Sequence, residues 1–133
     1  MKAIFSIVGV LLVGTVAWSD PSDLGKAQMA AAKKAYELNL LTIQKGVGDA
    51  KVGSLNFEKT SFWSKHWLKA ELVLREKKSD RVKAYEDHLD RMRELQGMVR
   101  KLVEVEFSFA AEAAAVEYYR LEAEIMLHKA KGK

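Results

Sequence analysis

Three histidines are the side chains of this chain best suited to holding a metal ion. His66, His88 and His128 each fall on a different predicted helix. A helical bundle could bring them together with Asp87 or Glu124, because imidazole and carboxylate groups are common ligands of zinc and copper. Glu124 and His128 are four residues apart and share a helix face, but such pairs are frequent in charged helices. We therefore expect histidines at the surface, with no metal site and no cofactor.

A cluster of carboxylates, formed by Glu86, Asp87 and Asp90, is a second candidate for chemistry. Arg91 lies four residues after Asp87 and Arg93 three after Asp90, so most of the negative charge has a local partner. This pattern, which surrounds His88, is typical of a solvated helix face. The chain contains no nucleophile elbow, glycine-rich phosphate loop or His-Glu metalloprotease motif. The sequence therefore predicts a protein that is not an enzyme.

Four aromatic residues near the middle of the chain are candidates for binding a partner: Phe57, Phe62, Trp63 and Trp67. The two tryptophans coincide with the predicted buried stripe of their helix, so core packing explains them. Phe57 and Phe62 fall off that stripe. If they are exposed, they form an apolar patch near a helix end, and such patches commonly mark partner surfaces.

The first residues have the pattern of an export signal. Lys2 supplies a positive charge, residues 3–16 form an apolar stretch, and Ala17 and Ser19 are the small residues that a signal peptidase recognises. We expect residues 1–19 to be a signal peptide that is cleaved before Asp20, with cleavage after Ala17 as a close alternative. The apolar stretch is shorter than the roughly 20 residues that span a bilayer, so a retained membrane anchor is the less favoured interpretation. The expected location is the periplasm or the extracellular space, with no integral membrane span after cleavage.

Composition excludes several classes of protein. The chain has no cysteine, which excludes disulfides, thiolate zinc sites, covalently attached haem and a bacterial lipoprotein anchor. The 22 lysines and arginines exceed the 18 acidic residues only slightly, and the two kinds are well mixed, so nucleic acid is not an expected partner. Stability must come from packing, and residues 20–133 are long enough for one modest core.

Apart from Pro21, the chain after the export signal has helical composition almost throughout. The first helix is expected over residues 23–45, where Gly46 and Gly48 should end it. Turn-forming residues then predict a loop over 47–56. Three further helices are expected over residues 57–77, from an N-cap at Ser79 or Asp80 to Val103, and from an N-cap at Ser108 to Lys129.

Apolar residues at a spacing of three and four mark the expected inner face of each helix. The third helix has the clearest stripe, and the stripe of the fourth contains small residues that allow close approach. Short connections imply antiparallel neighbours, so the fold should be all-α, an elongated helical hairpin or up-down bundle of about four helices with coiled-coil-like packing. In this single domain, residues 20–56 would be the first helix and loop, and residues 57–129 a three-helix antiparallel core. The stripes comprise Leu24, Ala27, Ala31, Ala35, Leu38 and Leu41; Trp63, Trp67, Ala70 and Leu74; Val82, Tyr85, Leu89, Met92, Leu95, Gln96, Val99, Leu102 and Val103; and Ala110, Ala114, Tyr118, Leu121 and Ile125.

Two segments of the chain also resemble each other. Residues 68–74 (LKAELVL) align with residues 121–127 (LEAEIML) at an offset of 53, and aromatic residues precede both. The similarity indicates either an internal duplication or two amphipathic helices of similar composition.

Residues 62–127 resemble a group of small exported bacterial proteins of unknown function. The resemblance is carried by residues 63–71 (WSKHWLKAE), 88–95 (HLDRMREL) and 115–124 (AVEYYRLEAE). The same half of the chain is more distantly similar to the helical hairpins of TolC-like outer-membrane efflux proteins. Where that family has a glycine turn before its last helix, this chain has residues 106–108 (EFS), and it has no amphipathic strands for a barrel.

The sequence thus predicts a non-catalytic, exported structural or protein-interaction module of the bacterial cell envelope. Its expected partner is another helical envelope protein or a second copy of itself. A periplasmic helical chaperone or metal-responsive sensor is the alternative, and an efflux-associated hairpin is the third.

Overall fold

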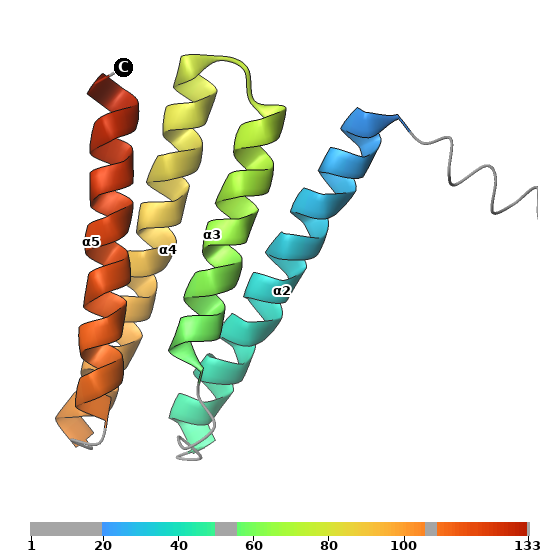
Figure 1. The fold of residues 1–133 in the computed structure, drawn as a ribbon. Helices are drawn as coiled ribbons and strands as arrows, with labels where there is room; N and C mark the ends of the chain where they lie inside the picture. Colours follow the sequence, from blue (N-terminus) through green and yellow to red (C-terminus); the bar gives the residue numbers. More distant parts are fainter. Residues whose placement is uncertain (1–19, 50–55, 106–108, 133) are drawn as a thin grey trace, which may run out of the picture.

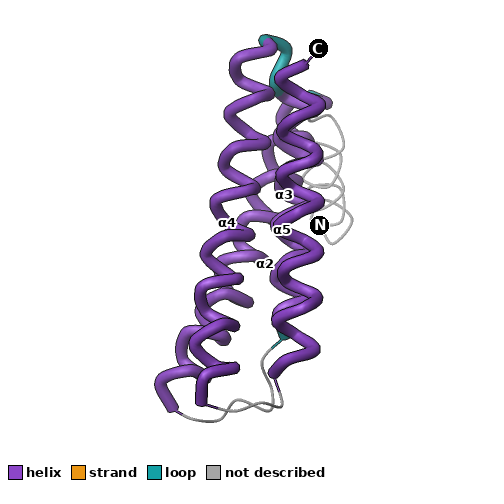
Figure 2. Tube along the Cα trace, turned by 90° about the vertical axis from the view of Figure 1, so that its left-hand side faces the viewer, coloured by secondary structure: helices purple, strands orange, loops and turns teal. Residues whose placement is uncertain are grey.

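The computed structural model describes residues 20–49, 56–105 and 109–132, and these residues form four helices. The helices are α2 (Pro21–Asp49), α3 (Phe57–Leu74), α4 (Lys78–Val105) and α5 (Ala110–Gly132). They run alternately in opposite directions along one long axis, so the predicted all-α up-down architecture is confirmed (Figures 1 and 2). The predicted signal peptide, the middle of the predicted loop and the predicted N-cap Ser108 lie outside the described residues.

The bundle is open rather than closed. α2 packs mainly on α3, α4 packs mainly on α5, and α3 joins the two pairs through contacts with α4 and α5. In Figure 1 the helices therefore stand in the order α5, α4, α3, α2, with α2 and α5 at opposite edges. Each edge helix consequently has a face that no other described helix covers. None of the four helices is both long and apolar enough to cross a bilayer.

The ends of α3 show how local contacts set the helix boundaries. The side-chain oxygen of Asn56 caps the start of α3 by accepting a hydrogen bond from the backbone N–H of Lys59 at 2.8 Å. α3 ends at Leu74, three residues before the predicted end, because Arg75 has an extended backbone. The Arg81 guanidinium donates to the backbone carbonyls of Leu72 and Arg75 at the C-terminal end of α3.

Two sequence-based boundaries are wrong. α4 begins at Lys78, so Ser79 and Asp80 lie inside its first turn and neither is the N-cap. α2 does not stop at Gly46 and Gly48 but continues to Asp49. Gly46 is buried one turn after the fully buried Ile43. A helical glycine costs about 1 kcal/mol relative to alanine, which burial of this face of α2 can outweigh.

The predicted stripe of α4 forms the centre of the core. Met92, Leu95 and Val99 are completely buried, and Leu89, Gln96 and Leu102 nearly so. Ile43 from α2, Phe57 from α3 and Val116 from α5 pack into the same cluster. The most regular stripe in the sequence therefore belongs to the helix that contributes most residues to the core.

The predicted inner faces of α2 and α5 are wrong, because most of their residues face solvent. The buried residues of α2 are instead Ala32, Tyr36 and Ile43, and α5 buries Val116 and Ala123. Both helices carry two apolar stripes, and periodicity alone does not determine which one meets the core. We call the exposed sets the α2 outer stripe (Leu24, Ala27, Ala31, Lys34, Leu38 and Leu41) and the α5 outer stripe (Ala111, Ala114, Tyr118, Leu121, Ile125 and His128).

The internal similarity at an offset of 53 does not correspond to equivalent positions in the bundle. It aligns Leu68, which is completely buried on α3, with Leu121, which is exposed on α5. The two segments thus present different faces to the core, which favours similar composition over duplication as the explanation.

Gly97 on α4 and Gly25 on α2 allow a matched stability test. Gly97 is exposed on α4, and a Cβ atom there would meet nothing within 4 Å. We expect Gly97→Ala to stabilise the protein by about 1 kcal/mol through helix propensity. At Gly25 a Cβ atom would lie 3.0 Å from Leu74 Cδ2, so Gly25→Ala should stabilise less or destabilise. Urea unfolding of both variants measures the difference, and equal stabilisation would contradict this packing of α2 on α3.

Candidate functional site

The histidines proposed as metal ligands do not come together. His88 is buried between helices, which corrects its predicted place on a solvated face, whereas His128 is exposed and His66 only partly buried. Glu124 forms an ion pair with Arg120 at 2.8 Å. Across the described residues, no group of three or more His, Asp or Glu side chains could hold a metal ion.

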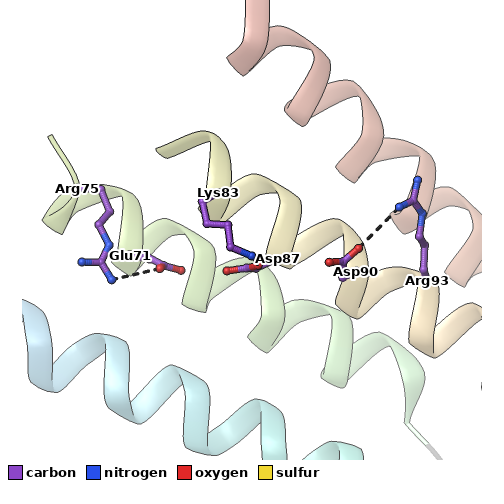
Figure 3. Close-up of polar contacts among 6 residues, drawn as sticks. All are labelled: Glu71, Arg75, Lys83, Asp87, Asp90 and Arg93. Carbon is purple, nitrogen blue, oxygen red and sulfur yellow. Dashed lines mark hydrogen bonds and ion pairs between the residues drawn. The ribbon is translucent and has the colours of Figure 1, made fainter. Parts of the chain in front are cut away.

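Two carboxylates of the α4 cluster, Asp87 and Asp90, form ion pairs along their own helix (Figure 3). Asp87 accepts a hydrogen bond from Lys83 at 2.6 Å, and this bond raises the pKa of the Lys83 ammonium group. Asp90 pairs with Arg93 at 3.7 Å, as the spacing predicts. The predicted pairing of Asp87 with Arg91 is wrong, because Arg91 turns inward. These carboxylates thus form a charged surface whose ion pairs each contribute at most about 0.5 kcal/mol.

The inward-facing Arg91 organises a buried polar cluster between α2, α3 and α4. Its Nε donates to Ser64 Oγ at 2.6 Å and its Nη2 donates to the Ser64 backbone carbonyl at 3.2 Å. The guanidinium lies over the Trp67 ring at 3.9 Å from its centroid and 5.6 Å from that of Tyr36. Such stacking is favourable in the absence of water. We call Tyr36, Ser64, Trp67, His88 and Arg91 the Arg91 cluster.

The hydrogen bonds of the cluster fix the protonation of His88. Ser64 Oγ accepts from Arg91, so its own proton is available to His88 Nδ1, which lies 2.8 Å away. A neutral imidazole that accepts at Nδ1 carries its proton on Nε2. Burial, reinforced by the positive charges of Arg91 and Lys65, lowers the pKa of His88 to about 3. His88 is therefore neutral at physiological pH.

Ser64 and His88 resemble part of a nucleophile and base pair, but their surroundings do not suit catalysis. Ser64 is completely buried and His88 is 2% exposed, so a substrate cannot approach the hydroxyl. The Ser64 hydroxyl is also occupied by Arg91 rather than facing an open site. A catalytic pair needs an accessible nucleophile and a base oriented by a third group. The geometry instead indicates a structural role in joining α3 to α4.

Tyr36, on α2, completes the Arg91 cluster. Its ring lies 5.8 Å from Trp67, and its buried hydroxyl has no hydrogen-bond partner among the described residues. Burial, together with the nearby carboxylate of Glu94, raises the pKa of Tyr36 well above its usual value. Tyr36 therefore contributes apolar packing, and its hydroxyl detracts from stability.

Neutral His88 predicts a loss of stability in mild acid. The unfolded chain binds a proton at His88 near pH 6.5, whereas the folded protein does so only near pH 3. Stability should therefore fall by about 1.4 kcal/mol for each pH unit as the pH decreases below 6.5. His88→Asn, which retains an acceptor for Ser64, should reduce this slope between pH 6 and 4.5, whereas exposed His128→Gln should not. Urea unfolding at several pH values tests this, and unchanged slopes in both variants would contradict the neutral, buried state of His88.

The four aromatic candidates divide into different environments. Phe57 is only 2% exposed and belongs to the core, which corrects its predicted place off the buried stripe. It is the first residue after the Asn56 cap, where the start of α3 turns its side chain inward. Phe62 is 51% exposed, as expected for a surface patch. Trp63 and Trp67 are partly buried, the second within the Arg91 cluster.

A groove between α3, α4 and α5 gathers several of these side chains. It has a volume of about 680 Å³, within the range of ligand pockets. Phe62 and Trp63 from α3 line it opposite Tyr118 and Tyr119 from α5, and we call it the aromatic groove. The Phe62 and Trp63 rings meet edge to face at 5.3 Å, and the two tyrosine rings do so at 5.7 Å. The groove thus presents aromatic surface from two helices.

The other residues of the Arg91 cluster and of the aromatic groove were hard to predict from sequence patterns. Arg91 does lie three residues after His88 and four before Leu95, a spacing that places it on the buried face of α4. Ser61 and Tyr119 have no such signal, because their role depends on how α3 and α5 are rotated. Comparison of the chain with protein-family models, with curated proteins and with solved structures finds no significant match.

Proposed function

We propose that this protein is a non-catalytic, exported interaction module of the bacterial cell envelope, which binds a helix of another envelope protein along the α5 outer stripe. The supporting observation is the stripe itself. Its residues recur at alternating intervals of three and four, the pattern of a coiled-coil seam, and all of them are exposed. Tyr118 is 62% and Ile125 55% exposed, although an apolar seam of this length is normally covered.

Charges beside the α5 outer stripe favour a different protein over a second α5. Glu117 and Glu122 flank the seam at the positions that face each other when two such helices pair in parallel. In a parallel pair of identical α5 helices Glu117 would face Glu122, whose ion pair with Lys65 at 3.1 Å reduces this repulsion without supplying an attraction between the helices. A partner helix with lysine or arginine at those positions would avoid this repulsion. The α2 outer stripe is a weaker seam because Lys34 interrupts it.

The proposal is tested by placing a photo-crosslinking amino acid at Leu121 and, as a control, at Arg100, which is exposed on α4. After irradiation of intact cells, we expect adducts with a helical envelope protein at position 121 and far fewer at position 100. Mass spectrometry identifies the adduct. Absence of any adduct at 121, or equal labelling at both positions, would contradict the proposal, and an adduct with the chain itself would replace it by self-association.

A chaperone that binds unfolded chains is the second candidate, because exposed apolar stripes also suit such clients. Suppression of aggregation distinguishes the two functions. A chaperone should protect an unfolded client in proportion to its concentration, and Leu121→Glu should abolish that protection. The metal-responsive alternative and the efflux-associated hairpin have no supporting observation among the described residues.

A further inference from the structure

The floor of the aromatic groove contains a polar group that the fold leaves without a partner. Ser61 lines the groove, is only 4% exposed, and its hydroxyl has no hydrogen-bond partner among the described residues. A buried hydroxyl without a partner destabilises a protein. A serine inside a helix commonly donates to the carbonyl four residues earlier, but no such bond forms here. Ser61 is thus a residue of the groove whose hydroxyl the described residues leave unpaired.

His88 and Met92 form the rest of the floor. The His88 imidazole is neutral, and its Nδ1 shares a hydrogen bond with Ser64 Oγ at 2.8 Å. Met92 is completely buried and supplies an adaptable apolar surface. The floor thus combines an apolar base with a hydroxyl and a neutral imidazole. These are the groups that orient a mostly apolar ligand in a pocket.

The rim of the groove carries balanced charge. Lys65 from α3 donates to both carboxylate oxygens of Glu122 on α5 at 3.1 Å, so this pair neutralises itself and joins the two helices. Lys59 and Glu58 are the other two charged residues of the rim. With two positive and two negative side chains, and with a neutral His88, the groove has no net charge to attract phosphate, carboxylate or a cation.

We propose that the aromatic groove binds an uncharged, planar aromatic compound that carries a hydroxyl or carbonyl oxygen, with that oxygen hydrogen-bonded to Ser61. The walls contributed by Phe62, Trp63, Tyr118 and Tyr119 favour a planar ring, because aromatic rings attract one another beyond the effect of the area they bury. The volume of the groove accommodates a ring system of this kind. This site goes beyond the proposed function and shares with it only Tyr118 and Glu122.

Three probes of the same ring system test the proposal: 2-naphthol, naphthalene and the 2-naphthoate anion. Each is titrated into the purified protein while backbone amide NMR shifts are followed. We expect 2-naphthol to shift amides of α3 and α5 around the groove and to bind about threefold to tenfold more tightly than naphthalene, the difference that one neutral hydrogen bond supplies. Naphthoate should bind more weakly than 2-naphthol, because its charge finds no uncompensated partner.

Two serine variants identify the hydrogen bond. Ser61→Ala should remove the preference for 2-naphthol over naphthalene, and in the absence of ligand it should raise the midpoint of thermal unfolding by roughly 3–6 °C, because a buried unpaired hydroxyl is lost. Ser79→Ala, at an exposed position of α4, should change neither quantity. No saturable shifts, shifts away from the groove, or an unchanged preference in Ser61→Ala would overturn the proposal.

Discussion

Arg91→Ala is expected to destabilise the folded protein by about 3 kcal/mol, because it removes a buried side chain together with its hydrogen bonds. Arg91 stacks on Trp67 at 3.9 Å and donates twice to Ser64, so the substitution leaves a cavity between α2 and α3 and removes both hydrogen bonds to Ser64. Urea unfolding followed by far-UV circular dichroism measures the change as a lower midpoint with an unchanged slope.

Two further variants separate the contribution of packing from that of charge. Arg91→Met retains most of the volume without the charge, and we expect a smaller loss of about 1 kcal/mol, because hydrophobic replacements of buried charges are often nearly neutral. Arg93→Ala, two positions away and exposed, should change stability by less than about 0.5 kcal/mol. If Arg91→Ala and Arg93→Ala had the same effect, the Arg91 cluster would not hold the helices together.

Phe57→Ala is expected to destabilise the protein by about 3–5 kcal/mol, whereas Phe62→Ala should cost less than about 1 kcal/mol. The two residues are of the same type and lie on the same helix, but the first is 2% and the second 51% exposed. Phe57 packs in the cluster formed by Met92 and Val116, and its removal leaves a cavity at the start of α3.

The two phenylalanines should also differ in their effects on ligand binding. Phe62 lines the aromatic groove, so Phe62→Ala should weaken binding of 2-naphthol while leaving the unfolding midpoint nearly unchanged. Thermal unfolding and the NMR titration together measure both properties. Similar destabilisation by the two variants would contradict the burial of Phe57 and restore its predicted place at the surface.

How much of this fold could be predicted from the sequence differs from helix to helix. The stripe of α4 was predicted almost completely, because its polar residues leave only one continuous apolar face. α2 and α5 each carry two apolar faces, and here the more regular face is the exposed one. Periodicity measures how apolar residues are arranged around a helix axis, and it contains no information about which neighbour covers them. Where a helix has two apolar faces, periodicity can therefore assign the wrong one to the core.

The polar residues of the interior were harder to predict, for a different physical reason. His88 lies among charged residues, and only the rotation of α4 places it against Ser64 on α3. Ser61 and Ser64 are small polar residues on a helix face that was expected to be occupied by tryptophan. Their burial depends on contacts between residues more than 20 positions apart, which a local pattern does not contain. Gly46 was wrongly predicted to end α2, because packing outweighs the low intrinsic helix propensity of glycine.

Because α2 packs on one side of the bundle only, it can detach without separating α4 from α5. α2 rests chiefly on α3, so its detachment breaks one helix interface and leaves the contacts of α3 with α4 and α5 in place. Its amides should therefore exchange with solvent sooner than those of α4, at a free energy below that of global unfolding. Detachment would also bring Trp67 and the positive charge of Arg91 to the surface together. In the closed bundle α2 therefore covers a cationic and aromatic surface.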